Sequence, residues 1–258
     1  MDKREIIYYT DEINDEFSLA KIAPRKIDGS YVYCHDSLFK KFTRFFWYRI
    51  VAMPIAFLYC KIKFHFRAVN AKVLKKAKKS GCFLYGNHTQ DIGDAFLPNL
   101  LNASKSKYFI VHPKNVSMKV LGKITPSLGA LPLPDDRAAY ANFLKAIERR
   151  ISEKKAIVIY PEAHIWPYYT GIRPFPDTSF HYPVKLGVPA FLFVNTYQKR
   201  KFSAKPKTVT YVDGPFYPDE KLPPVERKKD LRDRVYKRMC ELAKNSTVER
   251  IKYIKKDG

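Results

Sequence analysis

Short apolar segments alternate with longer amphipathic ones between Gly81 and Lys244, and this alternation restricts the fold more than any other feature of the chain. Each apolar segment has the length and the β-branched or aromatic content of a buried strand. The segments are CFLYG at 82–86, YFIV at 108–111, AIVIY at 156–160, VPAFLFV at 188–194 and TVTYV at 208–212. Strands that alternate with helices indicate an α/β sheet with helices packed on it.

Two other segments have the periodicity of amphipathic helices. The apolar side chains fall at Ala139, Phe143, Ile147 and Ile151 in residues 138–151, and at Leu231, Val235, Met239 and Leu242 in residues 225–244. Basic residues surround the apolar face of the second helix. We expect this helix to pack on the sheet, and the alternative is a second membrane contact.

A basic and aromatic region precedes the first predicted strand. Between Ser37 and Gln90 there are twelve Lys or Arg and no Asp or Glu, whereas soluble surfaces interleave charges of both signs. The apolar run Ile50–Cys60 is interrupted by Pro54 and is shorter than the roughly 20 residues of a spanning helix. We therefore expect residues 37–80 to form a membrane-associated helical region whose basic side chains, Arg49 included, reach anionic headgroups. A buried core helix is the alternative.

The charge of the whole chain points to anionic partners. Lys and Arg number 48 against 25 Asp and Glu, a net charge of +23, which fits nucleic acid, an acidic lipid surface or a phosphorylated substrate. The four cysteines form no C-x-x-C pair, so neither a disulfide framework nor a zinc knuckle is predicted. Residues 1–36 form a separate acidic segment whose start lacks the pattern of a secretory signal, which predicts a cytoplasmic protein.

The stretch GNHTQDIGDAF, residues 86–96, holds the strongest candidate for catalysis. His88 directly follows a predicted strand, and α/β proteins bind ligands at the carboxyl ends of their strands. A neutral imidazole can accept a proton near pH 7, and a carboxylate on its other nitrogen would fix its tautomer. On a continuous helix Asp91 would share the face of His88, whereas Asp94 would reach His88 only across a loop. A purely structural histidine is the alternative.

Two further polar residues stand at comparable places in the alternation. Glu162 follows the predicted strand 156–160 and Pro161, and Arg137 stands directly before the predicted helix 138–151. A guanidinium group there could hold a phosphate through two parallel hydrogen bonds. The alternatives are a turn or capping role for Glu162 and a plain surface charge for Arg137.

Four blocks between Gly81 and Tyr197 resemble, in their order, the glycerolipid acyltransferase family, which includes bacterial lysophosphatidate acyltransferases. The family's first block, Asn-His-x-x-x-x-Asp, is matched by Asn87-His88 with the aspartate one position later, at Asp94. The second, a glycine followed by apolar residues and Asp-Arg, is matched by Gly129 to Arg137. The third, Phe-Pro-Glu-Gly-Thr-Arg, reads Tyr-Pro-Glu-Ala-His-Ile at 160–165, and the fourth is the apolar stretch that begins with Val188-Pro189.

This resemblance implies a fold and an activity. Residues 81–258 would form a mixed sheet flanked by helices, preceded by N-terminal helices embedded in one leaflet at the cytoplasmic face of the membrane. The enzyme would move a fatty acyl group from an acyl carrier protein or coenzyme A thioester to the free hydroxyl of a lysophospholipid, with lysophosphatidic acid giving phosphatidic acid. Neither a cofactor nor a metal ion is implied.

The resemblance also assigns roles to residues. His88 would be the general base, and Asp94, or as second choice Asp91, would orient it. The acceptor would be bound by Arg137, Glu162, Asn87 and, in place of the arginine missing from the third block, Arg173.

A protein that binds nucleic acid or lipid without catalysis is the alternative. The net charge of +23 and the interleaved aromatic residues would suit an oligonucleotide. Much of this charge, however, flanks the most apolar segment, where a membrane surface would use both features together. The location of the charge therefore favours lipid over nucleic acid.

Overall fold

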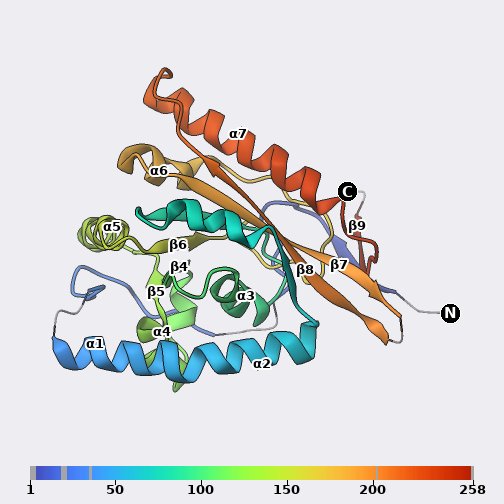
Figure 1. Ribbon diagram of the computed structural model, residues 1–258, viewed down its shortest axis with the longest axis horizontal. Coiled ribbons are helices and arrows are strands. Elements are labelled where there is room, and N and C mark those ends of the chain that lie inside the picture. The colour runs from blue at the N-terminus through green and yellow to red at the C-terminus, as the bar shows by residue number, and fades with distance from the viewer. Residues whose placement is uncertain (1–3, 19–21, 35–36, 202, 257–258) are drawn as a thin grey trace.

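The computed structural model describes residues 4–18, 22–34, 37–201 and 203–256. Within these residues a seven-stranded sheet crosses the molecule, with helices on both of its faces (Figure 1). The strand order is β2-β8-β7-β3-β6-β4-β5, and neighbouring strands are parallel except for the antiparallel pair β7 and β8. The strands are β2 (Arg67–Val69), β3 (Cys82–Gly86), β4 (Lys107–Val111), β5 (Ala130–Pro132), β6 (Ala156–Ile159), β7 (Ala190–Arg200) and β8 (Ser203–Phe216).

This architecture confirms the predicted mixed α/β fold. Each of the five predicted strand segments contributes to the sheet. The β7 and β8 strands extend further than predicted because their polar ends pair with each other out to Arg200 and Ser203. Apolarity reports burial, so a strand that continues into solvent as a hairpin carries no apolar signal there.

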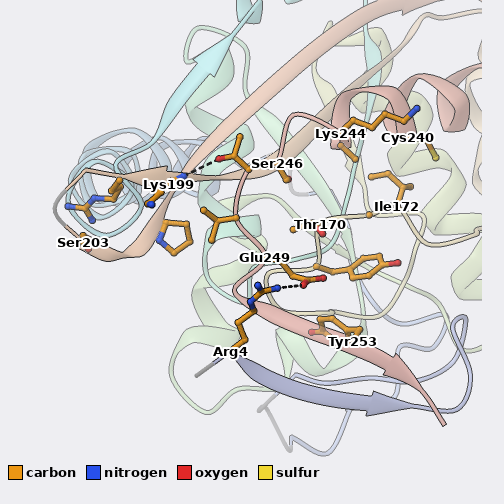
Figure 2. Close-up of a pocket in the computed structure, with 17 residues that line it drawn as sticks. Arg4, Thr170, Ile172, Lys199, Ser203, Cys240, Lys244, Ser246, Glu249 and Tyr253 are labelled. Carbon is orange, nitrogen blue, oxygen red and sulfur yellow. Dashed lines mark hydrogen bonds and ion pairs between the residues drawn. The ribbon is translucent and has the colours of Figure 1, made fainter. Parts of the chain in front are cut away.

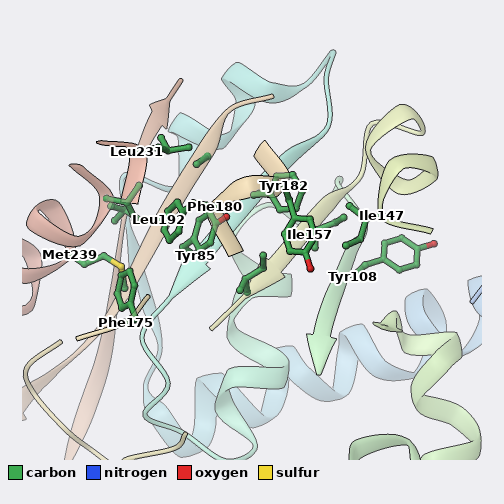
Figure 3. Packing of buried hydrophobic residues seen from close by; sticks show 14 of the residues in the cluster. Tyr85, Tyr108, Ile147, Ile157, Phe175, Phe180, Tyr182, Leu192, Leu231 and Met239 are labelled. Carbon is green, nitrogen blue, oxygen red and sulfur yellow. The ribbon is translucent and has the colours of Figure 1, made fainter. Parts of the chain in front are cut away.

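One face of the sheet is covered by α5 (Arg137–Ser152), α6 (His181–Leu186) and α7 (Pro224–Ala243). Figure 3 shows Ile147 of α5 and Leu231 and Met239 of α7 packing in one cluster with Tyr85 and Leu192 of the sheet. The apolar residues predicted on these two helices are all buried. The C-terminal helix therefore packs on the domain, as expected.

The opposite face is covered by α3 (Gly93–Leu101), by α2 (Met53–Phe64) and by a 3₁₀ turn, Ala71–Ala77. Successive strand residues point to opposite faces, so Leu84 packs here while its neighbours Phe83 and Tyr85 pack against the other layer. A further short helix, α4 (Leu121–Leu128), lies between β4 and β5 in the chain.

A single long helix runs along this second layer. The α1 helix (Leu38–Phe45), a π-helical stretch (Phe46–Ala52) and α2 form 27 continuous residues, about 40 Å. By length and composition alone this helix could cross a membrane. It is longer than the sequence indicated because neither Arg49 nor Pro54 interrupts it, and Pro54 lies at the first turn of α2, where proline is tolerated.

The long helix lies beside α3 and α4 (Figure 1), and polar contacts fix one of its sides to the domain. The Tyr48 hydroxyl donates to Asn99 Oδ1 at 2.7 Å and accepts from the Lys107 amide at 3.1 Å. Arg49 donates to the carbonyl oxygens of Ala103 and Ser104. Loop carbonyl oxygens beside the helix therefore bind the guanidinium group of Arg49, and contact between this residue and lipid headgroups stays a prediction.

The other side of the long helix is apolar and exposed. Only 17% of the most apolar 18-residue stretch of this helix is buried. The alternative, a buried core helix, is therefore wrong. Apolar surfaces of this extent usually contact another molecule or a membrane. The exposed side chains are Leu38, Phe39, Phe42, Phe45, Phe46, Ile50, Ile55, Phe57, Leu58 and Ile62.

The segments at the two ends of the chain meet. The β1 strand (Glu5–Tyr9) pairs in parallel with β9 (Ile251–Lys255) in a separate two-stranded sheet. Parts of the predicted segment 1–36, namely residues 1–3, 19–21 and 35–36, lie outside the described residues. The predicted boundary between residues 80 and 81 does not coincide with the edge of the sheet, since Arg67–Val69 already pairs with β8.

Candidate active site

The loop after β3 holds the histidine that the sequence singled out. His88 lies two residues beyond Gly86, and 18% of its side chain is exposed. Gly86 is required because a Cβ at this position would lie 2.0 Å from the ring of Phe193 on β7. The ring of Phe193 therefore occupies the space that a side chain at position 86, the last residue of β3, would need.

Asp94 is the carboxylate that binds His88. Its Oδ2 atom lies 2.8 Å from His88 Nδ1 and accepts the amide hydrogens of Thr89 and Gln90, each at 2.9 Å. Residues 87–92 form the loop that the sequence required for this contact, and Asp94 lies in the first turn of α3, where a helix favours negative charge. Asp91, by contrast, is exposed. The main-chain amides of Thr89 and Gln90 already donate to Asp94, so they are not available to a substrate oxyanion.

Burial raises the pKa of Asp94, and the hydrogen bonds that it accepts from His88 and the loop amides oppose this rise. Its second oxygen accepts from Asn195 Nδ2 at 3.1 Å, and Asn195 Oδ1 accepts in turn from Thr210 Oγ1 at 2.7 Å. A carboxylate held in this way favours a hydrogen on His88 Nδ1. The other ring nitrogen, Nε2, is then free to accept a proton.

The ring of His88 is held flat against an aromatic neighbour. Tyr160, which follows β6, stacks on it with ring centroids 4.4 Å apart and planes inclined by 17°. The Tyr160 hydroxyl donates to the carbonyl oxygen of Asp94 at 2.5 Å. Stacking on one side and a carboxylate on the edge leave the imidazole little rotational freedom.

Glu162 and Arg173 form a buried pair beneath the same loop. Glu162 Oε2 accepts the His88 amide at 3.0 Å, and Oε1 accepts the Arg173 amide at 3.1 Å. The Arg173 guanidinium lies 3.5 Å from Glu162 Oε2 and donates to the carbonyl oxygens of Glu162, His164 and Glu12. Burial raises the pKa of Glu162, and the charge of Arg173 opposes the rise.

This pair positions the backbone rather than offering a free cation to a ligand. Arg173 is completely buried, in contrast to the accessible phosphate-binding role that the resemblance implied. Asn87 is also buried and exchanges two hydrogen bonds with the main chain of Asn195, which ties the end of β3 to β7. Arg173 and Asn87 therefore hold the main chain around the site in place.

Arg137 follows β5, the strand at one edge of the sheet. It is the first residue of α5, and Asp136 caps the helix by accepting the Ala139 amide at 2.7 Å. Three strand spacings separate β5, which leads into α5, from β3, or about 14 Å across the sheet. Among the residues that the structure describes, no hydrogen bond or ion pair joins the exposed Arg137 side chain to His88 or to its partners.

A second group of polar residues, which was not predicted as a unit, lies on the segment whose Glu162 and Trp166 are hydrogen-bonded to the main chain of His88. Glu16 accepts the Ile165 amide at 3.1 Å, lies 3.3 Å from His164 Nδ1 and lies 3.9 Å from Lys114 Nζ. Partial burial raises the pKa of Glu16, but hydrogen bonds from the main chain of Ser18 and Ile165 and from His164 hold it below its ordinary value. The group thus binds a carboxylate anion. The sequence signals were separate: His164 stands in the third block, and Lys114 is the lysine of HPK, directly after the strand YFIV.

A large cavity lies on the other side of the segment that follows the third block. Its volume is about 1170 Å³, and Figure 2 shows it between the β7–β8 hairpin, the segment after α7 and the β1–β9 sheet. Arg4, Lys199, Arg200 and Lys244 line it together with several hydroxyl groups. His88 is not among its lining residues.

The described residues contain no cluster of side chains that could bind a metal ion. No three His, Cys, Asp or Glu side chains in residues 4–18, 22–34, 37–201 and 203–256 are grouped so that they could hold a metal ion. The groups that the site does bring together are an oriented imidazole, a buried carboxylate and an adjacent anion-binding group.

Comparisons with known proteins agree with the fold. Residues 65–191 match the family model described as Acyltransferase. The fold is similar to the crystal structure of the 1-acyl-sn-glycerophosphate (LPA) acyltransferase PlsC from Thermotoga maritima, with a TM-score of 0.55 and 17% sequence identity. The similarity covers 81% of this chain and 89% of that chain. The sequence matches no curated protein.

Proposed function

Because this chain belongs to the glycerolipid acyltransferase family, we propose that it moves an acyl group from an acyl thioester to the free hydroxyl of a lysophospholipid. Lysophosphatidate is the acceptor that we propose, and phosphatidate is the product. The observation that carries the proposal is the pair of His88 and Asp94, 2.8 Å apart, at the carboxyl end of β3. The pair has the residues and the orientation that general-base catalysis requires.

In the proposed reaction the acceptor hydroxyl gives its proton to His88 Nε2. The hydroxyl oxygen then attacks the thioester carbonyl carbon, and the carbon–sulfur bond breaks as the new ester forms. The thiolate leaves and takes the proton from the imidazolium. Asp94 stabilises the positive charge that His88 carries in between, and Tyr160 keeps the ring in plane. No covalent enzyme intermediate is needed.

The acceptor's phosphate is proposed to bind where the Glu16 carboxylate now lies. Support comes from the Ile165 amide, the His164 ring and the Lys114 ammonium group, which already hold an anion there. A phosphate offers the same charge sign and more acceptor oxygens, so it would compete with Glu16 for these donors. Arg137 and Arg173 are not needed for this contact.

The membrane is proposed to contact the exposed apolar side of Leu38–Phe64. The opposite side of this helix is bound to the domain through Tyr48 and Arg49, which favours a helix lying along one leaflet over one that crosses the bilayer. The basic residues of the region would attract anionic headgroups, and the cytoplasmic leaflet carries these lipids. A lysolipid could then reach His88 without leaving the surface.

The test is thiol release from an acyl thioester, followed together with diacyl product, with and without lysophosphatidate. We expect acceptor-dependent turnover that falls about 10²- to 10⁴-fold in His88→Ala, because general-base assistance is worth this much. His181→Ala, on α6 and outside the site, is the matched control. Turnover near wild type in His88→Ala would refute the mechanism, and vesicle binding without turnover by the wild type would favour a noncatalytic lipid-binding protein.

A further inference from the structure

The cavity beside the β7–β8 hairpin carries positive charge that the fold does not neutralise. Of its four cationic lining residues, Arg4 forms an ion pair with Glu249 (Figure 2), and the charged atoms of the pair lie 3.1 Å apart. In the part of the chain that the structure describes, Lys199, Arg200 and Lys244 have no carboxylate within ion-pair distance. Glu249 is the only described acidic residue in the lining. Like charges around one cavity repel each other, and an anion that enters relieves the repulsion.

The lining also offers neutral hydrogen-bonding groups and aromatic rings. Thr170, Ser203 and Ser246 supply hydroxyl groups. The rings of Tyr169 and Tyr253 line the cavity and lie edge to face, with centroids 5.4 Å apart. Cations, hydroxyls and aromatic rings together suit a ligand that has both phosphate groups and a planar base.

A short segment of chain, hydrogen-bonded to the His88 loop, leads from that loop to the cavity wall. The Trp166 amide donates to the His88 carbonyl oxygen at 3.1 Å, and the Tyr168 amide donates to that of Thr89 at 3.0 Å. The next residues, from Tyr169 to Ile172, form one wall of the cavity. A ligand in the cavity therefore lies one loop away from the proposed base.

We propose that this cavity binds the nucleotide part of a coenzyme A thioester, the acyl donor. The inference rests on the proposed function and specifies its donor. The unpaired Lys199, Arg200 and Lys244 bind the diphosphate and the 3′-phosphate, and Tyr169 or Tyr253 contacts the adenine. The flexible pantetheine arm then passes Tyr168 and presents the thioester to His88.

The location of the charges favours coenzyme A over an acyl carrier protein. Lys199 and Arg200 at the hairpin and Lys244 after α7 stand on different walls around one concave space of about 1170 Å³. A small polyanion can contact all three at once from inside this space. The acidic surface of a carrier protein is convex and rigid, and it would need the cations on one open face.

The chain contains its own probe for this binding. Of the two tryptophans, Trp166 stacks on Tyr253 at 4.8 Å and lies 5.3 Å from Tyr169, both in the cavity wall. Trp47→Phe removes the other one, which is in the long helix. In that background we expect coenzyme A to change Trp166 fluorescence with saturation. Removal of the 3′-phosphate should weaken the binding, and pantetheine alone should not bind.

Charge reversal separates this cavity from the catalytic site. Lys199→Glu and Lys244→Glu should each raise the Kd for coenzyme A at least about tenfold, equivalent to about 1.4 kcal/mol. The KM for acyl-coenzyme A should rise with it, while the KM for lysophosphatidate and the turnover of an acyl-pantetheine donor should not change. The matched control is Lys237→Glu, which makes the same charge change on the exposed side of α7.

The outcomes distinguish this proposal from the proposed function. Coenzyme A that binds equally well to the wild type and to Lys199→Glu would overturn the cavity assignment. So would fluorescence titrations in which acyl carrier protein saturates the protein and coenzyme A does not. If no acyl transfer occurs but coenzyme A binding depends on Lys199 and Lys244, the proposed function fails and the cavity assignment stands.

Discussion

Replacement of Asp94 by asparagine separates the charge of this residue from its shape. The amide oxygen of the new side chain can still accept from Thr89, Gln90 and a neutral His88. Its NH₂ group would then face Asn195. The Asn195 amide can turn so that its oxygen accepts from this NH₂ group, because the Thr210 hydroxyl can rotate and accept a hydrogen bond from the Asn195 NH₂ group. The fold is therefore expected to survive, and the change removes only the negative charge beside the imidazole.

The size of the effect follows from the electrostatics. Two unit charges about 4 Å apart interact by about 4 kcal/mol at an effective dielectric constant of about 20. The His88 imidazolium of the transition state would lose this interaction, which corresponds to about a 10³-fold lower rate. We expect kcat of D94N to fall by about this factor with little change in KM, measured as acceptor-dependent thiol release.

The stability of D94N should change in the opposite direction. Burial raises the pKa of Asp94 in the folded protein, so the folded state binds this proton more tightly than the unfolded chain does. The contribution of Asp94 to stability therefore falls as pH rises from its unfolded value, about 3.9, through the raised folded value. At neutral pH D94N should be at least as stable as the wild type in urea unfolding.

D91N is the control, because Asp91 is exposed and makes no contact with the His88 ring. A D94N enzyme within threefold of wild type would refute the assignment of Asp94. So would a loss of activity in D91N that exceeds the loss in D94N.

Three further predictions concern other parts of the molecule. Gly86→Ala should lower the free energy of unfolding by about 1–3 kcal/mol, because its Cβ would overlap the ring of Phe193; an unchanged melting temperature would contradict this. Glu16→Gln should lower the KM for lysophosphatidate about fivefold, because it removes the competing negative charge while the new amide oxygen still accepts the Ile165 hydrogen bond. An unchanged or higher KM would mean that the phosphate of the lysolipid binds elsewhere. Burial lowers the pKa of Lys107 to about 7, so between about pH 7 and pH 10 the unfolded chain binds this proton more tightly than the folded protein does. The free energy of unfolding should therefore rise with pH in this range, by at most about 1.4 kcal/mol per pH unit. In urea unfolding at pH 7 and pH 9 this rise should be absent from Lys107→Met, and an equal rise in both proteins would exclude Lys107 as its source.

The sequence predicted the parts of the fold that repeat a pattern. Strands such as Cys82–Gly86 and helices such as α7 bury one face or both, and burial leaves a period of two or 3.6 residues in the sequence. His88 was found for the same reason, since it directly follows a strand that the pattern defines. The β1–β9 pair and β2 were not predicted, because these short strands are half exposed and have no such pattern.

The sequence by itself determined which side chains the site could use, namely the histidine, its nearby carboxylates, and the glutamate and arginine of the later blocks. Only the tertiary structure decided which of them are buried and which contact one another. The loop 87–92 turns Asp94 onto His88 and leaves Asp91 in solvent, which spacing along the chain could not settle. Arg173 is buried against Glu162, whereas Arg137 is exposed at the start of the helix that follows β5, although both are equally cationic in the sequence. Chemical type is a property of the residue, whereas burial, partner and distance arise from contacts between distant segments, and those contacts exist only in the folded chain.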